Sequence, residues 1–157
     1  MTELKVPKIG NEEAHDLALG TWGIMCDGLM SPLVEKHGQE EALEILRPYM
    51  EKLGESAPIF AEMMGIEGND AMTIASIFCL YEEQVLKVDG KVTEVSPDRV
   101  VKQSMRCPFQ NLTSGFCWAF TIMAEGMAEA INPDYKLTVT QMMTQGDPMC
   151  EWVVEKK

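Results

Sequence analysis

Positive charge is scarce in this sequence. Thirteen lysine and arginine residues stand against 25 aspartate and glutamate residues, and the formal net charge is -12 at pH 7. A surface that binds nucleic acid or an anionic membrane needs positive charge to approach phosphate groups. The composition therefore disfavours nucleic acid and a membrane as partners. It favours a small-molecule ligand or substrate, or another protein, and leaves room for a homo-oligomer.

Long apolar runs and linker segments are also lacking. No run approaches the roughly 18 to 20 apolar residues that span a bilayer, and residues 1–10 lack the apolar segment of a signal peptide. We therefore expect a cytoplasmic protein. No Pro-, Gly- or Ser-rich stretch separates two parts, and 157 residues with 46% hydrophobic content suffice for one core. The expected organisation is an N-terminal extension at 1–10 and a single domain at 11–157.

Histidine is rarer than cysteine, with two histidines against five cysteines. An odd number of cysteines without a secretion signal argues against a disulfide framework, because a reducing compartment does not sustain one. Free thiols are therefore expected. Cys26 and Cys79 lie within apolar helical stretches, and core packing is our interpretation for both.

The first half of the chain has helical spacing. Apolar residues recur every three or four residues from 11 to 28 or beyond, from 39 to 64 and from 70 to 84, which predicts helices there. Asn11 is a good N-cap for the first helix. We expect Glu82 and Glu83 on the exposed side of the third.

The second half reads mainly as strands. Asp89-Gly90 predicts a two-residue hairpin between strands at 85–88 and 91–95. Further strands are expected at 99–107, 135–144 and 149–155, with a helix at 115–130. The predicted fold class is α+β, a single domain with about four helices packed on an antiparallel sheet of about five strands.

Three cysteines lie at boundaries between these elements. Cys107 ends a strand, Cys117 lies in the first turn of a helix and Cys150 opens the last strand. If the last strands pair with the earlier ones, all three thiols meet at one end of the sheet. The helix start would stabilise a thiolate at Cys117 and depress its pKa, although packing beside neighbouring phenylalanines explains the same residue.

These thiols have several possible chemical roles. Cys107, Cys117 and Cys150 would suit zinc or an iron–sulfur cluster as metal ligands, but their spacing does not match the short ligand pairs of zinc ribbons. A redox pair between two of them is a third alternative.

A catalytic cysteine also needs a base. The only histidines, His15 and His37, lie in the helical region. Asp147 is the alternative base or orienting group, although an aspartate before proline in a turn also accepts local amide hydrogen bonds.

A family resemblance rests on these cysteines. Cys107-Pro108, the helix cysteine Cys117 and the hairpin Gly146-Asp147-Pro148-Met149-Cys150-Glu151-Trp152 resemble the L-2-amino-thiazoline-4-carboxylic acid hydrolases. The similarity spans about residues 11–155, including the glycine and acidic helix of 38–54. The hairpin is also similar in outline to 4-vinyl-reductase-type small-molecule-binding domains. The resemblance implies hydrolytic opening of a cyclic thiazoline at a carbon–nitrogen bond.

Two functions follow as hypotheses. The first is a hydrolase-like protein that acts on a C–N bond of a small cyclic amidine or thiazoline, with Cys117 as nucleophile and Asp147 as its partner. The second is a non-enzymatic module that binds a small molecule, a metal or a metal cofactor, with Cys107, Cys117 and Cys150 as ligands.

Overall fold

Helices and strands alternate in blocks along residues 8–157, the part of the chain that the computed structural model describes. The elements are α1 (Asn11–His37), α2 (Gln39–Gly54), α3 (Ala57–Met64), α4 (Ala71–Leu80), the π-helical turn η1 (Tyr81–Val85), β1 (Asp89–Val95), β2 (Arg99–Arg106), α5 (Ser114–Ile131), β3 (Tyr135–Gln141), the 3-10 turn η2 (Met143–Gln145) and β4 (Cys150–Lys156). Of the extension expected at 1–10, residues 1–7 lie outside the described part.

The strands form one antiparallel sheet in the order β1-β2-β4-β3. Val100 pairs with Val154 and Lys102 with Trp152 across the two central strands, so these side chains share the face toward the helices. The α+β class is confirmed. The sheet has four strands rather than about five.

The missing strand is the one expected at 85–88. Val85 ends η1 instead, and Asp89-Gly90 begins β1 rather than forming a hairpin turn. A Cβ atom added at Gly90 would lie 2.5 Å from the Ser104 hydroxyl oxygen and 2.8 Å from the Gln103 carbonyl oxygen. Glycine is therefore needed at this position because β2 approaches it closely, not because a turn requires its conformational freedom.

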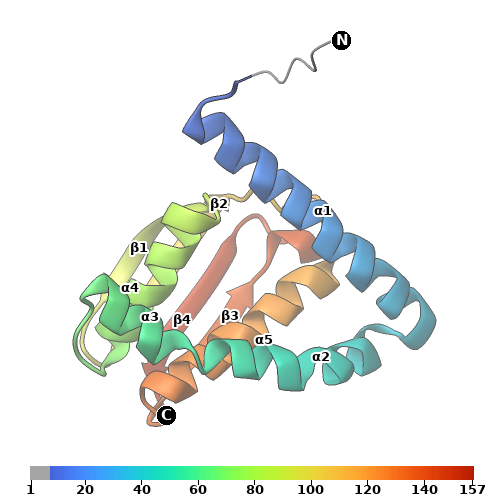
Figure 1. The fold of residues 1–157 in the computed structure, drawn as a ribbon. Helices are drawn as coiled ribbons and strands as arrows, with labels where there is room; N and C mark the ends of the chain where they lie inside the picture. The colour runs from blue at the N-terminus through green and yellow to red at the C-terminus, as the bar shows by residue number, and fades with distance from the viewer. Residues whose placement is uncertain (1–7) are drawn as a thin grey trace.

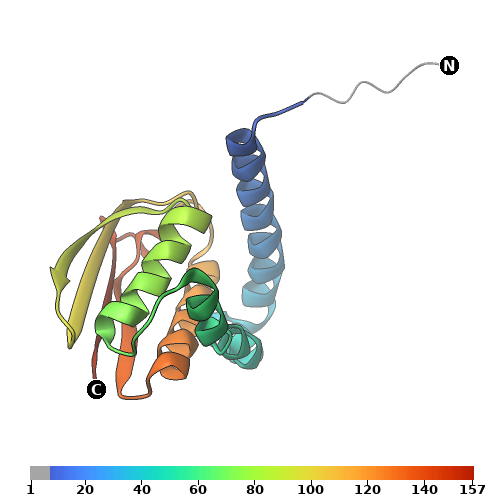
Figure 2. The same cartoon turned by 60° about the vertical axis from the view of Figure 1, so that its left-hand side comes forward.

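The helices form two layers on one face of the sheet (Figure 1). α4 and α5 pack directly on the sheet, and the main core lies between them, with Ile74, Val100, Leu137 and Val154 at its centre. α1, α2 and α3 form the outermost layer (Figure 2). Within the described part of the chain, no helix covers the opposite face of the sheet (Figure 2).

α1 is an unbroken helix of 27 residues. By length and composition alone it could cross a membrane, although a core helix or a leader segment passes the same test. The expectation that no apolar run approaches membrane-spanning length was therefore wrong for this helix. The reason is that Asp27 is the one charged residue between Asp16 and Glu35.

α2 and α5 cross through two glycines. A Cβ atom added at Gly54 would lie 2.4 Å from the Met123 carbonyl oxygen, and one added at Gly126 would lie 2.9 Å from the Glu51 carbonyl oxygen. Backbone therefore touches backbone at the crossing, which fixes α2 and the following α3 over α5.

Replacing Gly54 with alanine should destabilise the protein by about 1–3 kcal/mol, because the added methyl group has no room without a shift of backbone. The matched control is Gly20→Ala in α1, where an added Cβ meets no atom within 4 Å. That change should stabilise the helix by roughly 0.5–1 kcal/mol. Urea denaturation of both variants measures the change in the free energy of unfolding. An equal change at the two sites would contradict the close backbone contact at the crossing.

Candidate functional site

Three thiols line one cavity between the sheet and the helices. Cys107 follows β2, Cys117 lies in the second turn of α5 and Cys150 opens β4, and all three border a space of about 100 Å³. We call it the thiol cavity. Its lining is Phe78, Glu82, Leu86, Val88, Cys107, Phe109, Phe116, Cys117, Phe120, Thr121, Val139, Met142, Cys150, Glu151 and Trp152. The structure thus brings together the three cysteines that sequence reasoning singled out.

Aromatic rings close the thiol cavity on the side of α1. The Trp22 ring packs edge to face against Phe109, Phe116 and Phe120, with centroid distances of 5.8, 5.7 and 5.5 Å. A Cβ atom added at Gly23 would lie 3.0 Å from the Phe109 ring. α1 is therefore seated directly on the aromatic wall of the cavity.

The thiols have raised pKa values. Burial raises the pKa of Cys107 to about 12, although the Phe109 amide donates a 3.4 Å hydrogen bond to its sulfur. Burial also raises the pKa of Cys117 and of Cys150, whose sulfur accepts a hydrogen bond from the Met143 amide at 3.3 Å. The pKa of Cys117 therefore moves in the opposite direction to the depression expected at a helix start, because burial disfavours the thiolate.

The proposed partners of the cysteines are engaged elsewhere. The Asp147 carboxylate accepts a hydrogen bond from the Met142 amide at 2.7 Å, which is the local turn role, and Asp147 is not part of the cavity lining. His15 Nε2 lies 2.9 Å from the Val85 carbonyl oxygen, and His37 Nδ1 lies 3.1 Å from the Glu41 carboxylate.

Sequence reasoning missed the carboxylate that does line the cavity. Glu82 is buried, not exposed as expected, and its carboxylate accepts hydrogen bonds from the Trp152 indole and the Lys102 ammonium, both at 3.0 Å. The Lys102 side chain is fully buried and also contacts Glu83 at 2.9 Å. Burial raises the pKa of Glu82 and outweighs the opposing effect of Lys102. Burial alone would lower the pKa of Lys102, but the two carboxylates raise it.

A signal for this pair was present in the sequence. Glu82 follows the apolar Phe78 by four residues, on the same face of the helix, and Lys102 follows Val100 by two, on the same face of the strand. A carboxylate and an ammonium group that each fall on an otherwise apolar face predict a buried ion pair.

The metal hypothesis gains no support from the geometry. Among residues 8–157, no group of three or more His, Cys, Asp or Glu side chains is arranged to hold a metal ion. The zinc and iron–sulfur expectations for Cys107, Cys117 and Cys150 do not fit this arrangement, since a tight metal site needs its ligands about 2.0–2.3 Å from one centre.

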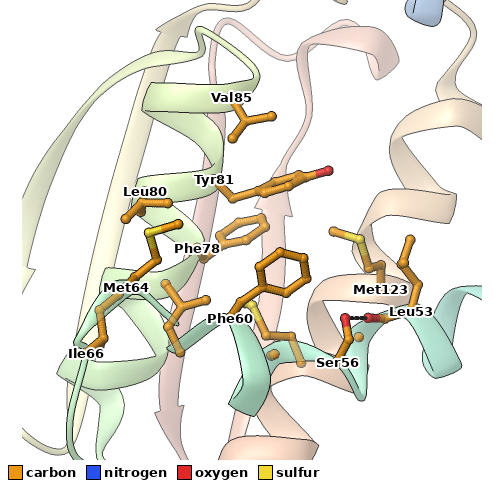
Figure 3. Close-up of a pocket in the computed structure, with 14 residues that line it drawn as sticks. Leu53, Ser56, Phe60, Met64, Ile66, Phe78, Leu80, Tyr81, Val85 and Met123 are labelled. Atoms are coloured by element: carbon orange, nitrogen blue, oxygen red, sulfur yellow. Dashed lines mark hydrogen bonds between the residues drawn. The ribbon is translucent and has the colours of Figure 1, made fainter. Parts of the chain in front are cut away.

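A second, larger cavity lies between α2, α3, α4 and α5 (Figure 3). This apolar cavity has a volume of about 180 Å³ and is lined by Leu53, Gly54, Ser56, Ala57, Phe60, Met64, Ile66, Ile77, Phe78, Leu80, Tyr81, Val85, Met123 and Met127. Figure 3 shows the rings of Phe60, Phe78 and Tyr81 on one side and Leu53 and Met123 on the other. The Ser56 hydroxyl donates to the Leu53 carbonyl oxygen at 2.6 Å. Tyr81 is the other polar side chain of the lining, and burial raises its pKa, which keeps its hydroxyl group protonated.

Phe78 borders both cavities. Its ring packs edge to face against Trp152 at a centroid distance of 5.3 Å. One aromatic side chain on α4 therefore contributes to the walls of both the thiol cavity and the apolar cavity.

Comparison with known proteins identifies the fold alone. No family model matches this sequence, and no curated protein matches it. The chain is similar to a trafficking protein particle complex subunit 3 from Naegleria fowleri covalently bound to palmitic acid, with a TM-score of 0.72 and 13% identity over 90% of this chain and 96% of that one. It is also similar to the phenol-responsive sensory domain of the transcription activator PoxR with phenol, with a TM-score of 0.63 and 14% identity over 88% of this chain and 74% of that one.

Replacing Lys102 with methionine should destabilise the protein by about 3–5 kcal/mol at neutral pH, because it leaves the buried Glu82 carboxylate without its ammonium partner. The pKa of Glu82 is raised in the folded state, so that the folded state takes up a proton at a higher pH than the unfolded state does. The stability of this variant should therefore rise as the pH falls from about 7 to about 5. Urea denaturation across that range measures both effects.

The double variant Lys102→Met with Glu82→Gln is the control. It removes both charges and should recover most of the lost stability. If the double variant lost as much stability as Lys102→Met and Glu82→Gln lose together as single substitutions, the result would contradict the buried ion pair.

Proposed function

We propose that this chain is a small-molecule-binding domain that holds a neutral, largely apolar ligand in the apolar cavity without transforming it. The observation that carries the proposal is the lining of this cavity. Among the lining residues in the described part of the chain, Ser56 and Tyr81 alone have polar side chains. Pockets that bind small molecules are mostly apolar and contain a few polar groups that fix orientation. Catalysis would need several convergent polar groups, which this lining does not supply.

The size of the cavity suggests the class of ligand. A volume of about 180 Å³ slightly exceeds the roughly 150 Å³ apolar cavity that holds benzene in an engineered protein. One aromatic ring, or a short stretch of alkyl chain, therefore fits. The protonated Tyr81 hydroxyl can orient one polar group of the ligand. An anionic ligand is disfavoured by the net charge of -12.

The two structural neighbours support this proposal by analogy. One was determined with phenol and the other with covalently bound palmitic acid, so the shared fold accommodates both a ring and an acyl chain in those proteins.

Replacing Phe60 with aspartate should weaken the binding of phenol or octanol by at least about tenfold, because it places a charge at the half-exposed mouth of the cavity. Met63→Asp is the matched control, since Met63 lies on the same helix, is more exposed and does not line the cavity. Isothermal titration calorimetry of the three proteins measures the difference. Failure of the unmodified protein to bind either probe, or equal weakening by both substitutions, would contradict the proposal.

A C–N hydrolase acting on a small cyclic amidine or thiazoline is the second candidate. It is supported by the presence of Cys117 and the Glu82 carboxylate in one cavity, and by the resemblance to the thiazoline-carboxylate hydrolases. In this mechanism Glu82 takes the proton of Cys117 and the sulfur attacks the amidine carbon. The ring nitrogen leaves as an amine with that proton and one from the exocyclic amino group. Water then hydrolyses the resulting thioimidate to a carbamoyl product and restores the free thiol. The raised pKa of the thiol makes this route slow.

Cys117→Ser should abolish any turnover of 2-amino-thiazoline-4-carboxylate under this second candidate and leave phenol binding in the apolar cavity unchanged. Mass spectrometry of the ring-opened S-carbamoyl product measures turnover, with Cys79→Ser as the control because Cys79 lines neither cavity. Turnover that survives Cys117→Ser would remove the nucleophile from the mechanism.

A further inference from the structure

α1 presents an apolar face to the outside of the molecule. Leu17, Ile24, Met25 and Leu29 are each exposed over 62–75% of their surface. The single charge within this part of the helix, Asp27, faces the body of the protein, where it accepts hydrogen bonds from the Thr113 amide and hydroxyl groups at 2.9 and 2.7 Å. The outward face therefore carries no charge over several turns.

The exposed area of this face can be estimated from its four large apolar side chains, Leu17, Ile24, Met25 and Leu29. At roughly 60–120 Å² of apolar area per fully exposed side chain, these partly exposed groups present on the order of 150–350 Å². The largest patch on a typical monomer is about 300–600 Å². α1 alone therefore presents a patch near the lower end of that range, and a two-fold contact would bury it on both copies.

The spacing on α1 suits another helix. Ala14, Ala18, Thr21, Met25 and Gly28 are all exposed and follow one another at intervals of four and three residues, the repeat along which two helices pack side by side. Several of these side chains are small, and a Cβ atom added at Gly28 meets no atom within 4 Å. A second helix can therefore approach closely along this line.

The charges at the two ends of α1 fit the same helix running in the opposite direction. Glu12 and Glu13 occupy the first turn, whereas Lys36 and His37 occupy the last beside Glu35, and His37 contacts the Glu41 carboxylate of its own chain. In an antiparallel pair the acidic first turn of one copy lies near Lys36 of the other, and the two-fold symmetry makes this contact twice. A parallel pair would bring the like charges together. The net charge of -12 disfavours an anionic bilayer as the occupant.

We propose that the outward face of α1 pairs with α1 of a second copy of this chain, antiparallel, in a two-fold symmetric dimer. Met25 lies near the middle of the contact. The dimer buries the apolar face of α1 and leaves the apolar cavity on each protomer outside the pair of α1 helices.

The test compares two methionines of equal exposure. Met25 in α1 is 62% exposed and Met105 in β2 is 61% exposed, so Met25→Glu and Met105→Glu make the same chemical change on and off the proposed contact. Sedimentation velocity from about 1 to about 100 µM should show a dimer for the unmodified chain and for Met105→Glu, and a dissociation constant at least about 100-fold weaker for Met25→Glu. Circular dichroism of all three proteins should be the same.

Three outcomes would overturn the proposal. The first is a monomeric unmodified chain throughout this range. The second is a dimer that Met25→Glu leaves intact, which would place the contact elsewhere. The third is a monomer that cosediments with neutral phosphatidylcholine vesicles and loses that binding in Met25→Glu, which would assign the face to a lipid bilayer. Phenol binding by Met25→Glu serves as an independent readout of the apolar cavity.

Discussion

The ion pair between Glu82 and Lys102 is the constraint on which both cavities depend. Glu82 comes from the π-helical turn and Lys102 from a central strand, and the buried Glu82 carboxylate is not stable in an apolar interior without the Lys102 ammonium. The Trp152 indole binds the same carboxylate from the adjacent strand. These contacts fix the end of α4 on the middle of the sheet. Phe78, one turn before Glu82, is thereby held against Trp152, where it borders both cavities.

The two cavities differ in chemistry because different elements enclose them. The apolar cavity lies among helices, whose backbone groups are already hydrogen-bonded internally, so that side chains alone determine its lining. The thiol cavity lies where a strand end, a loop and η1 meet, and element ends of this kind bring polar side chains inward. The apolar cavity suits recognition of an apolar molecule, and the thiol cavity contains the groups capable of covalent chemistry.

Much of the fold could be predicted from the sequence because it rests on periodicity. The apolar spacing of 39–64 and the alternation in 99–107 each appear as expected, as α2 and α3 and as β2. The role of Asp89-Gly90 could not be predicted, since a dipeptide does not reveal that a neighbouring strand will pass within contact of its glycine.

The site was predictable only in part. Cys107, Cys117 and Cys150 reach one cavity because each lies at an element boundary on the side of the sheet that the helices cover. The pKa of Cys117 was misjudged because a helix terminus contributes roughly 0.3–1 kcal/mol, whereas desolvation can shift a pKa by several units. The burial of Glu82 goes against the usual exposure of a carboxylate, and its sequence signal is its position four residues after Phe78.

The shared position of Phe78 has a further consequence. Because the same ring lines both cavities, a guest that displaces it in the apolar cavity also alters the wall of the thiol cavity. Occupancy of one chamber is thereby communicated to the other by packing alone.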